Sequence, residues 1–196
     1  MKNKDWVGTQ QFILSGNNRK DDAATNDYYA TEPRAVEILL DHETFSKDVW
    51  EPACGEGHIS KVLLERGYDV LSTDLVYRGF GFKTPIDFLN ESFTEADDID
   101  IITNPPYKYA REFVEKSLQC VGDGHKVAML LKLTFLEGKA RKQLFQKYPP
   151  KTIYVFSSRV CCGKNGVFNR KNNAVAYAWF VWEKGFQGDP IVRWVN

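Results

Sequence analysis

The hydrophobic and polar positions of this chain first become periodic after residue 30, where they predict a helix of about three turns. Thr31 suits the N-cap of this helix, and Pro33 suits its first turn, where a missing backbone N–H costs nothing. Apolar residues then recur at helical spacing, at Ala35, Val36, Leu39 and Leu40.

From residue 48 onward, short apolar segments alternate with helical ones. We expect strands at residues 48–51, 69–73, 99–103, 126–133, 152–157 and 174–182, and helices at 58–66, 108–121 and 139–147. Strands that alternate with helices indicate βαβ units and a parallel sheet. Residues 174–182 are apolar at both odd and even positions, which is typical of a strand covered on both faces by helices. The pattern therefore predicts an α/β fold.

The domain organisation follows from length and composition. Residues 1 to 27 are polar and rich in amides, which predicts a flexible N-terminal arm before a single domain at residues 28–196. The N-terminus has no apolar signal core, so we expect a cytoplasmic protein. The four cysteines lack the spacing of a disulfide framework or a zinc site, so we expect reduced thiols and no metal.

Charge is divided unevenly between the two halves of the chain. Residues 1–100 hold 10 Lys and Arg against 20 Asp and Glu, and residues 101–196 hold the remaining 16 against 6. The net charges are 10 minus 20, or −10, and 16 minus 6, or +10, which cancel in the whole chain. This division is compatible with a cationic cofactor and a polyanionic partner.

The strand-to-helix turns carry the candidate chemistry, because open α/β sheets bind ligands at the carboxyl ends of their strands. In the first turn, Gly55 and Gly57 allow a tight backbone and a close approach to a ligand. Ser60 stands where a dinucleotide-binding turn has a third glycine or alanine. Glu51 and Glu56 are unsuited to a pyrophosphate, so this turn favours a cationic cofactor.

Carboxylates follow the next strand. Asp74 lies at a strand end, where it can accept hydrogen bonds from a ribose diol, although a helix cap is an equally common role. Asp87 is placed to accept from an adenine amino group, with Phe88 against the ring.

The most specific motif is Asn104-Pro105-Pro106-Tyr107, directly after the strand at 99–103. A planar amino group is a poor nucleophile because its lone pair is delocalised. The Asn104 side-chain oxygen and the Pro105 carbonyl can each accept one of its hydrogens, which localises the lone pair. The prolines fix φ and remove two N–H donors, and Tyr107 offers a ring on which an extruded base can stack.

These residues, in this order and spacing, resemble the S-adenosylmethionine-dependent amino-methyltransferases, particularly the small phage- and prophage-type DNA adenine-N6 methyltransferases. Residues 27–33, 135–138 and 173–185 are similar to that group as well, so the resemblance covers residues 27 to 190. It implies a Rossmann-like class I methyltransferase fold whose seven-stranded, mostly parallel sheet has helices on both faces and an antiparallel last strand. It also implies S-adenosyl-L-methionine as cofactor, DNA as partner and adenine N6 as the methylated atom.

The resemblance assigns roles to individual residues. Cofactor binding is assigned to Tyr29, Thr31, Glu51, Ala53, Gly55, Gly57, Asp74, Asp87 and Phe88. The target amine and its base are assigned to Asn104, Pro105, Pro106 and Tyr107. We expect no large target-recognition domain within this sequence, and therefore at most a short recognition site.

Residues 157–173 contain four cations and no acid, which indicates either a solvated hairpin or a nucleic-acid contact loop. The candidate contacts are Arg159, Lys164, Asn165, Phe168, Arg170 and Lys171. The Asn-Pro-Pro-Tyr motif is shared by enzymes acting on several planar amines, so a protein glutamine amide and an RNA guanine or adenine stay open as substrates. A non-catalytic accessory protein that binds nucleic acid is the alternative of another class.

Overall fold

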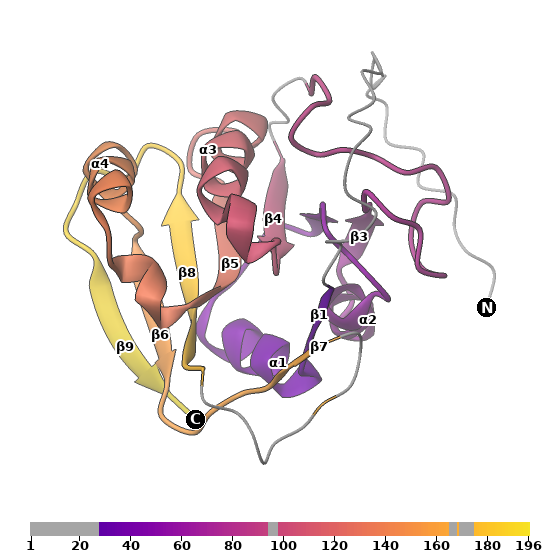
Figure 1. Cartoon of the computed structure of the whole chain (residues 1–196), viewed down its shortest axis with the longest axis horizontal. Helices are drawn as coiled ribbons and strands as arrows, with labels where there is room; N and C mark the ends of the chain where they lie inside the picture. The colour runs from indigo at the N-terminus through magenta and orange to yellow at the C-terminus, as the bar shows by residue number, and fades with distance from the viewer. Residues whose placement is uncertain (1–27, 94–97, 165–167, 169–174) are drawn as a thin grey trace.

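A seven-stranded sheet forms the centre of the computed structural model, which describes residues 28–93, 98–164, 168 and 175–196 (Figure 1). Its strand order is β3-β2-β4-β5-β8-β6-β9, and only β8 runs antiparallel to the others. The elements are β1 (Tyr29–Thr31), α1 (Pro33–His42), β2 (Asp48–Glu51), α2 (His58–Glu65), β3 (Asp69–Ser72), β4 (Ile99–Thr103), η1 (Tyr107–Tyr109), α3 (Ala110–Cys120), β5 (Lys126–Lys132), η2 (Leu133–Leu136), α4 (Lys139–Lys147), β6 (Thr152–Phe156), β7 (Cys162–Lys164), β8 (Tyr177–Glu183) and β9 (Ile191–Val195).

The predicted α/β fold with a mostly parallel sheet is confirmed, with one correction at its edge. The strand predicted at 174–182 corresponds to β8 and is antiparallel, as expected. It is not the last strand, however, because β9 follows it and pairs in parallel with β6. The predicted segments supply six strands of the main sheet, and β9 is the seventh.

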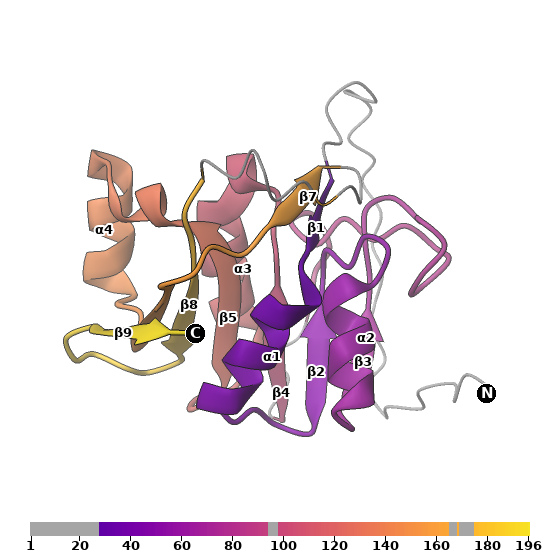
Figure 2. The ribbon, with the colours of Figure 1, turned by 90° about the horizontal axis from the view of Figure 1, so that it is seen from below.

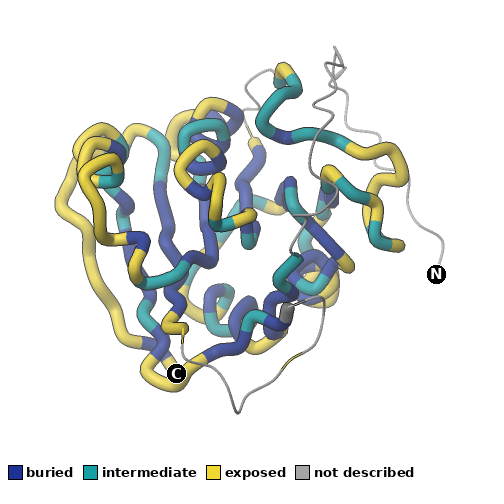
Figure 3. The backbone as a smooth tube through the Cα atoms, in the orientation of Figure 1, coloured by how far each residue is buried: buried dark blue, intermediate teal, exposed yellow. Residues whose placement is uncertain are grey.

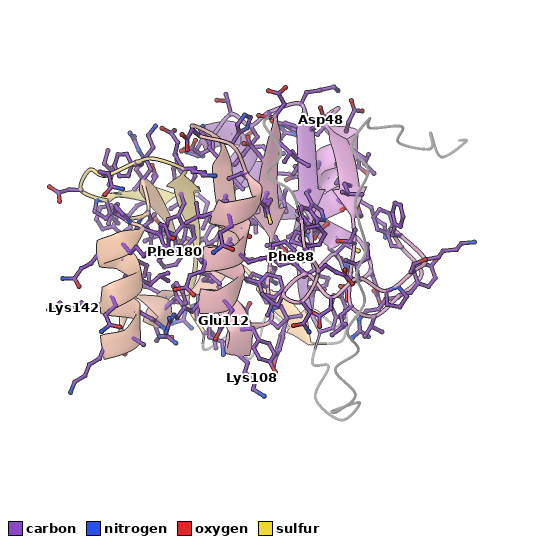
Figure 4. The ribbon with its side chains drawn as sticks, turned by 90° about the horizontal axis from the view of Figure 1, so that it is seen from above. Asp48, Phe88, Lys108, Glu112, Lys142 and Phe180 are labelled. Carbon is purple, nitrogen blue, oxygen red and sulfur yellow. The ribbon has the colours of Figure 1, made fainter. Side chains whose placement is uncertain are left out.

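Helices cover both faces of the sheet, as the apolar pattern of β8 predicted. Helices α1 and α2 lie on one face (Figure 2), and α3 and α4 lie on the other (Figure 4). Each face has its own core: Leu39 and Leu63 pack with Trp179 on the first, and Phe113 and Leu144 belong to the cluster around Phe180 on the second. The central strands β4, β5 and β8 are almost fully buried (Figure 3). No helix in the described ranges is long and apolar enough to span a bilayer.

A second, two-stranded sheet lies on the face covered by α1 and α2 (Figure 2). It joins β1 to β7, with Ala30 opposite Gly163. Thr31, predicted as the N-cap of α1, instead belongs to β1, and the N-cap is Glu32, which makes no side-chain cap. The Glu32 carboxylate accepts a hydrogen bond from the Cys161 N–H at 2.9 Å instead. Long-range pairing thus overrides the local capping preference of Thr31.

Candidate functional site

The turn between β2 and α2 has the tight backbone that its glycines predicted. Gly55 has φ of 55° and Gly57 has φ of 76°, in the region that a side chain disfavours. A Cβ built on Gly55 falls 2.2 Å from the Tyr28 ring, and one on Gly57 falls 2.3 Å from the Phe80 ring. Two aromatic rings therefore lie directly against the glycines.

Glu51 supports this turn from within the protein. Its side chain is 1% exposed, and its carboxylate accepts hydrogen bonds from the Ser60 N–H, at 2.9 Å, and from the Ser60 hydroxyl. It therefore joins the end of β2 to the first turn of α2. Burial raises the pKa of Glu51 to about 8, although the hydrogen bonds from Ser60 oppose this shift.

This shift predicts a pH dependence of stability. In the unfolded chain Glu51 loses its proton near pH 4.5, whereas in the folded chain it keeps the proton to about pH 8. The folded state therefore binds more protons between these values, and the free energy of unfolding falls as pH rises through this window. Glu51→Gln should flatten this fall, as measured by urea unfolding at several pH values. Glu56→Gln, an exposed change in the same turn, is the control, and a wild-type pH dependence in Glu51→Gln would contradict the prediction.

Asp74 lies beside the same turn. Its Oδ2 accepts from the Gly55 N–H at 2.7 Å, and its Oδ1 accepts from the Val76 N–H at 2.9 Å. Burial raises the pKa of Asp74 above its ordinary value, and these hydrogen bonds oppose that shift. A carboxylate has about four acceptor positions, so the neighbouring backbone N–H groups of Gly55, Leu75 and Val76 leave capacity for a ribose hydroxyl.

The structure corrects the adenine-stacking role of Phe88. Its ring is 2% exposed and packs in the core, with ring centroids 5.1 Å from Trp50 and 5.0 Å from Phe113. Asp87 beside it accepts from the Leu89 N–H at 3.1 Å and from the Asn90 side chain. Phe88 thus has no face open to a ligand, because an apolar ring next to a strand gains more from core burial.

Asn104, after β4, is held by the small sheet. Its Nδ2 donates to the Tyr29 carbonyl at 3.0 Å and to the Thr31 hydroxyl at 3.1 Å. Among the described residues, the buried Oδ1 of Asn104 has no hydrogen-bond partner. Both amide hydrogens are therefore directed toward β1, which fixes the orientation of an unused acceptor.

The two prolines differ in their surroundings. Pro105 is buried and Pro106 is exposed. The Pro106 carbonyl accepts from the Tyr109 N–H at 2.9 Å and so begins η1, whereas the Pro105 carbonyl accepts no hydrogen bond from the described residues. The second acceptor that the motif predicted is thus also unused.

Tyr107 lies in a cluster of aromatic side chains. Its ring centroid is 5.7 Å from that of Tyr29 and 5.9 Å from that of Tyr177, and the Lys132 ammonium lies 4.9 Å from it. Burial raises the pKa of the Tyr107 hydroxyl well above its ordinary value, with the Cys162 thiol beside it. The ring is therefore packed on several sides, with the Lys132 ammonium next to it.

The structure thus brings together residues from four distant segments. Tyr29 and Thr31 contact Asn104 directly, while Asp74 and Gly55 contact one another. The remaining predicted residue of the turn, Ala53, packs against the core. In the described part of the chain, no group of three His, Cys, Asp or Glu side chains is placed to hold a metal ion.

The predicted nucleic-acid loop is described only in part. Arg159 is exposed, and the backbone of Lys164 belongs to β7, so this segment includes a strand as well as a loop. The Phe168 ring lies 5.7 Å from that of His58. The predicted contacts at positions 165, 170 and 171, namely Asn165, Arg170 and Lys171, lie outside the described residues.

Sequence reasoning missed four residues that contact the site. Tyr28 and Phe80 lie on the glycines, and Lys132 and Tyr177 lie beside Tyr107. The Tyr28 hydroxyl also bonds His58 Nδ1 at 2.7 Å. Of these four residues, Lys132 could have been found from the sequence. It follows the apolar residues of a predicted strand and so ends that strand with a cation, at the end of the sheet where ligands bind.

Neither a protein-family model nor a curated protein matches the chain. Solved structures do match it. The methyltransferase subunit of a type I restriction-modification system from Streptococcus thermophilus is 14% identical, with a TM-score of 0.56 over 87% of this chain and 48% of that one. The chain thus spans about half the length of that subunit.

Two other matches span nearly whole enzymes. A predicted O-methyltransferase from Agrobacterium tumefaciens is 9% identical, with a TM-score of 0.60 over 83% of this chain and 85% of that one. A TehB-like SAM-dependent methyltransferase from Corynebacterium glutamicum is 16% identical, with a TM-score of 0.52 over 83% of this chain and 91% of that one. These likenesses confirm the predicted fold class: the chain has the α/β fold of S-adenosylmethionine-dependent methyltransferases.

Proposed function

We propose that this chain transfers a methyl group from S-adenosyl-L-methionine to an exocyclic amino nitrogen, and that the natural target is adenine N6 in DNA. The observation that carries the proposal is the unused Oδ1 of Asn104, whose orientation is fixed by the Tyr29 carbonyl and the Thr31 hydroxyl. An oriented, buried acceptor without a partner is unfavourable for the protein alone and matches an amine donor from a substrate.

The residues around the glycine turn fit this cofactor. Gly55 and Gly57 give the chain a tight turn at the end of β2, and Asp74 beside it keeps acceptor capacity for a ribose hydroxyl. The buried Glu51 contributes by accepting the hydrogen bond from the Ser60 N–H, which joins the turn to the first turn of α2. The comparisons support S-adenosyl-L-methionine as the cofactor because the similar folds include SAM-dependent methyltransferases. When bound, it supplies an electrophilic methyl group.

The residues after β4 act on the other reactant. Asn104 Oδ1 and the Pro105 carbonyl each accept one N–H of the planar amine, which concentrates its lone pair toward the methyl group. The buried position of these acceptors limits competition from water. The chain therefore acts by orienting and polarising the amine, and positioning accounts for a large part of the rate.

Two observations favour DNA as the substrate. The aromatic rings around Tyr107 suit a planar base, and a restriction-modification subunit is among the similar structures. The test is mass spectrometry of nucleosides from the DNA of cells that express the chain, where N6-methyladenine is expected. Methylated RNA nucleosides or a methylated glutamine peptide without methylated DNA would contradict the DNA assignment, and the absence of any methylated product would favour an accessory protein.

Loss of the Asp74 carboxylate tests the cofactor site. Asp74→Ala should weaken S-adenosyl-L-methionine binding by about 1 to 3 kcal/mol, because hydroxyls lose a charged acceptor and the turn loses its bond to Gly55. Titration calorimetry measures this directly. Asp74→Asn, which keeps one acceptor oxygen, should give a smaller loss. Unchanged affinity in Asp74→Ala would remove this residue from the ribose site.

A further inference from the structure

Lys132 places a positive charge beside Tyr107 of the candidate site. It ends β5 opposite Tyr177 of β8, and its ammonium lies 4.9 Å from the centre of the Tyr107 ring. Within the described residues, no carboxylate forms an ion pair with it. The ring attracts the ammonium without occupying its N–H donors, so Lys132 stays able to bind an anion beside Tyr107.

The cations continue along the chain from Lys132. Residues 132–147 contain five Lys and Arg and one acid, Glu137, which is a net charge of 5 minus 1, or +4. Helix α4 lies within this segment and has one buried residue, Leu144. Lys139 and Lys142 are exposed and three positions apart, so they share a face of the helix. Lys142 projects away from the sheet, as Lys108 does on η1 (Figure 4).

Arg141 has a different role, because it connects α4 to η2. Its guanidinium donates to the Thr134 carbonyl at 2.8 Å and to the Glu137 carbonyl at 3.0 Å, and it lies 4.9 Å from the centre of the Phe135 ring. The short segment between Lys132 and α4 is thereby fixed. The first turn of α4, which carries the two lysines, is thereby joined to the segment that follows Lys132.

We propose that Lys132, Lys139 and Lys142 bind the sugar-phosphate backbone of the DNA substrate. Lys132 contacts a phosphate next to the methylated nucleotide, and the two lysines of α4 contact phosphates flanking it. This inference rests on the proposed function. Charge complementarity supports it: the segment from Lys132 to the end of α4, with one acid and five cations, suits a polyanion, and lysine binds phosphate as a point charge. These contacts fix the strand in register and carry no base specificity.

The experiment measures the affinity of the full chain for a fluorescent duplex oligonucleotide between about 50 and 200 mM salt. Each phosphate contact contributes about −0.9 to the slope of log affinity against log salt. The triple variant Lys132→Gln/Lys139→Gln/Lys142→Gln should therefore flatten this slope by about 2 to 3. Its affinity for S-adenosyl-L-methionine should stay unchanged.

The control is the double variant Lys47→Gln/Lys151→Gln. These two lysines directly precede β2 and β6, so they lie at the amino ends of the strands, whereas the candidate site lies at the carboxyl ends. Its slope should equal that of the wild type. Lys132→Gln alone should raise the KM for the oligonucleotide about 10-fold with kcat nearly unchanged, and Lys132→Arg should restore it.

The outcomes separate this inference from the proposed function. If wild-type protein methylates DNA and the triple variant keeps the full salt slope, the phosphate contacts lie elsewhere and the inference is wrong, while the proposed function stands. If wild-type protein binds S-adenosyl-L-methionine and methylates a protein or RNA in place of DNA, both the DNA assignment and this inference are wrong, while methyl transfer stands.

Discussion

Asn104→Ala should lower the rate of methyl transfer by at least about 100-fold, while the affinity for S-adenosyl-L-methionine changes by no more than a few-fold. The variant loses the Oδ1 acceptor that has no partner among the described residues. It loses no group of the glycine turn, because the side-chain hydrogen bonds of Asn104 in the described part of the chain are with Tyr29 and Thr31. Single-turnover kinetics and titration calorimetry measure the two quantities separately.

Thr31→Val is the matched variant for this prediction. It keeps the shape of the side chain and removes one of the two acceptors that orient the Asn104 amide. The rate should therefore fall by a smaller factor than in Asn104→Ala, because the Tyr29 carbonyl still holds the amide at 3.0 Å. Normal turnover by Asn104→Ala would show that this residue does not polarise the amine, and would favour the accessory-protein alternative.

A methyl group added at Gly57 should have the second large effect. Its φ of 76° costs a residue with a Cβ about 1 to 2 kcal/mol, and displacement of the Phe80 ring adds about 1 to 3 kcal/mol. If this turn faces the cofactor, as we propose, part of the cost should appear as weaker binding. We expect Gly57→Ala to lower S-adenosyl-L-methionine affinity at least about 30-fold, which is about 2 kcal/mol.

Gly67→Ala separates backbone strain from crowding. Gly67 follows the other end of α2 and has φ of 91°, but a Cβ there meets nothing within 4 Å. It should lower the melting temperature without changing cofactor affinity. Calorimetric titration and thermal unfolding of both variants make the comparison. Equal affinities in the two alanine variants would show that the glycine turn is a structural turn and does not face the cofactor.

Periodic segments of the sequence predict the elements that pack through their own side chains. Helix α1 has Pro33 in its first turn as expected, although it begins one residue later than a Thr31 N-cap predicts, and α4 has the predicted bounds of residues 139 and 147. The strand β8 was visible from its apolar residues because both its faces are buried. In each case the local pattern and the tertiary burial point to the same structure.

Elements that depend on distant partners were not predictable in this way. The three-residue strands β1 and β7 pair across more than 120 residues of sequence, and neither has a periodic pattern of its own. The edge strand β9 is mostly exposed, with Trp194 71% exposed, so its residues do not alternate between core and solvent. Phe88 was assigned to a ligand because sequence cannot distinguish a ring in the core from a ring against adenine.

The place of the candidate site in the fold was predictable where its residues directly follow the strands of the sheet. Gly55, Gly57, Asp74 and Asn104 follow strands of a parallel sheet, so their meeting at one edge follows from topology. The contacts of Tyr28 and Lys132 depend on side-chain packing between segments remote in sequence. Such contacts leave no periodic signal in the chain.

The position of β8 between β5 and β6 has a consequence for how the chain folds during its synthesis. Strand β6 pairs only with β8 and β9 in the described sheet, and both of these strands follow it in the sequence. When β6 leaves the ribosome, neither of its partner strands has yet been synthesised. Until β8 emerges, the apolar edge of β5, including Met129 and Leu131, is also unpaired. The half of the sheet that contains β2, β3 and β4 can form first. The half that contains β6, β8 and β9 can form only after β8 has been synthesised. We therefore expect nascent chains paused before residue 177 to bind chaperones and to aggregate.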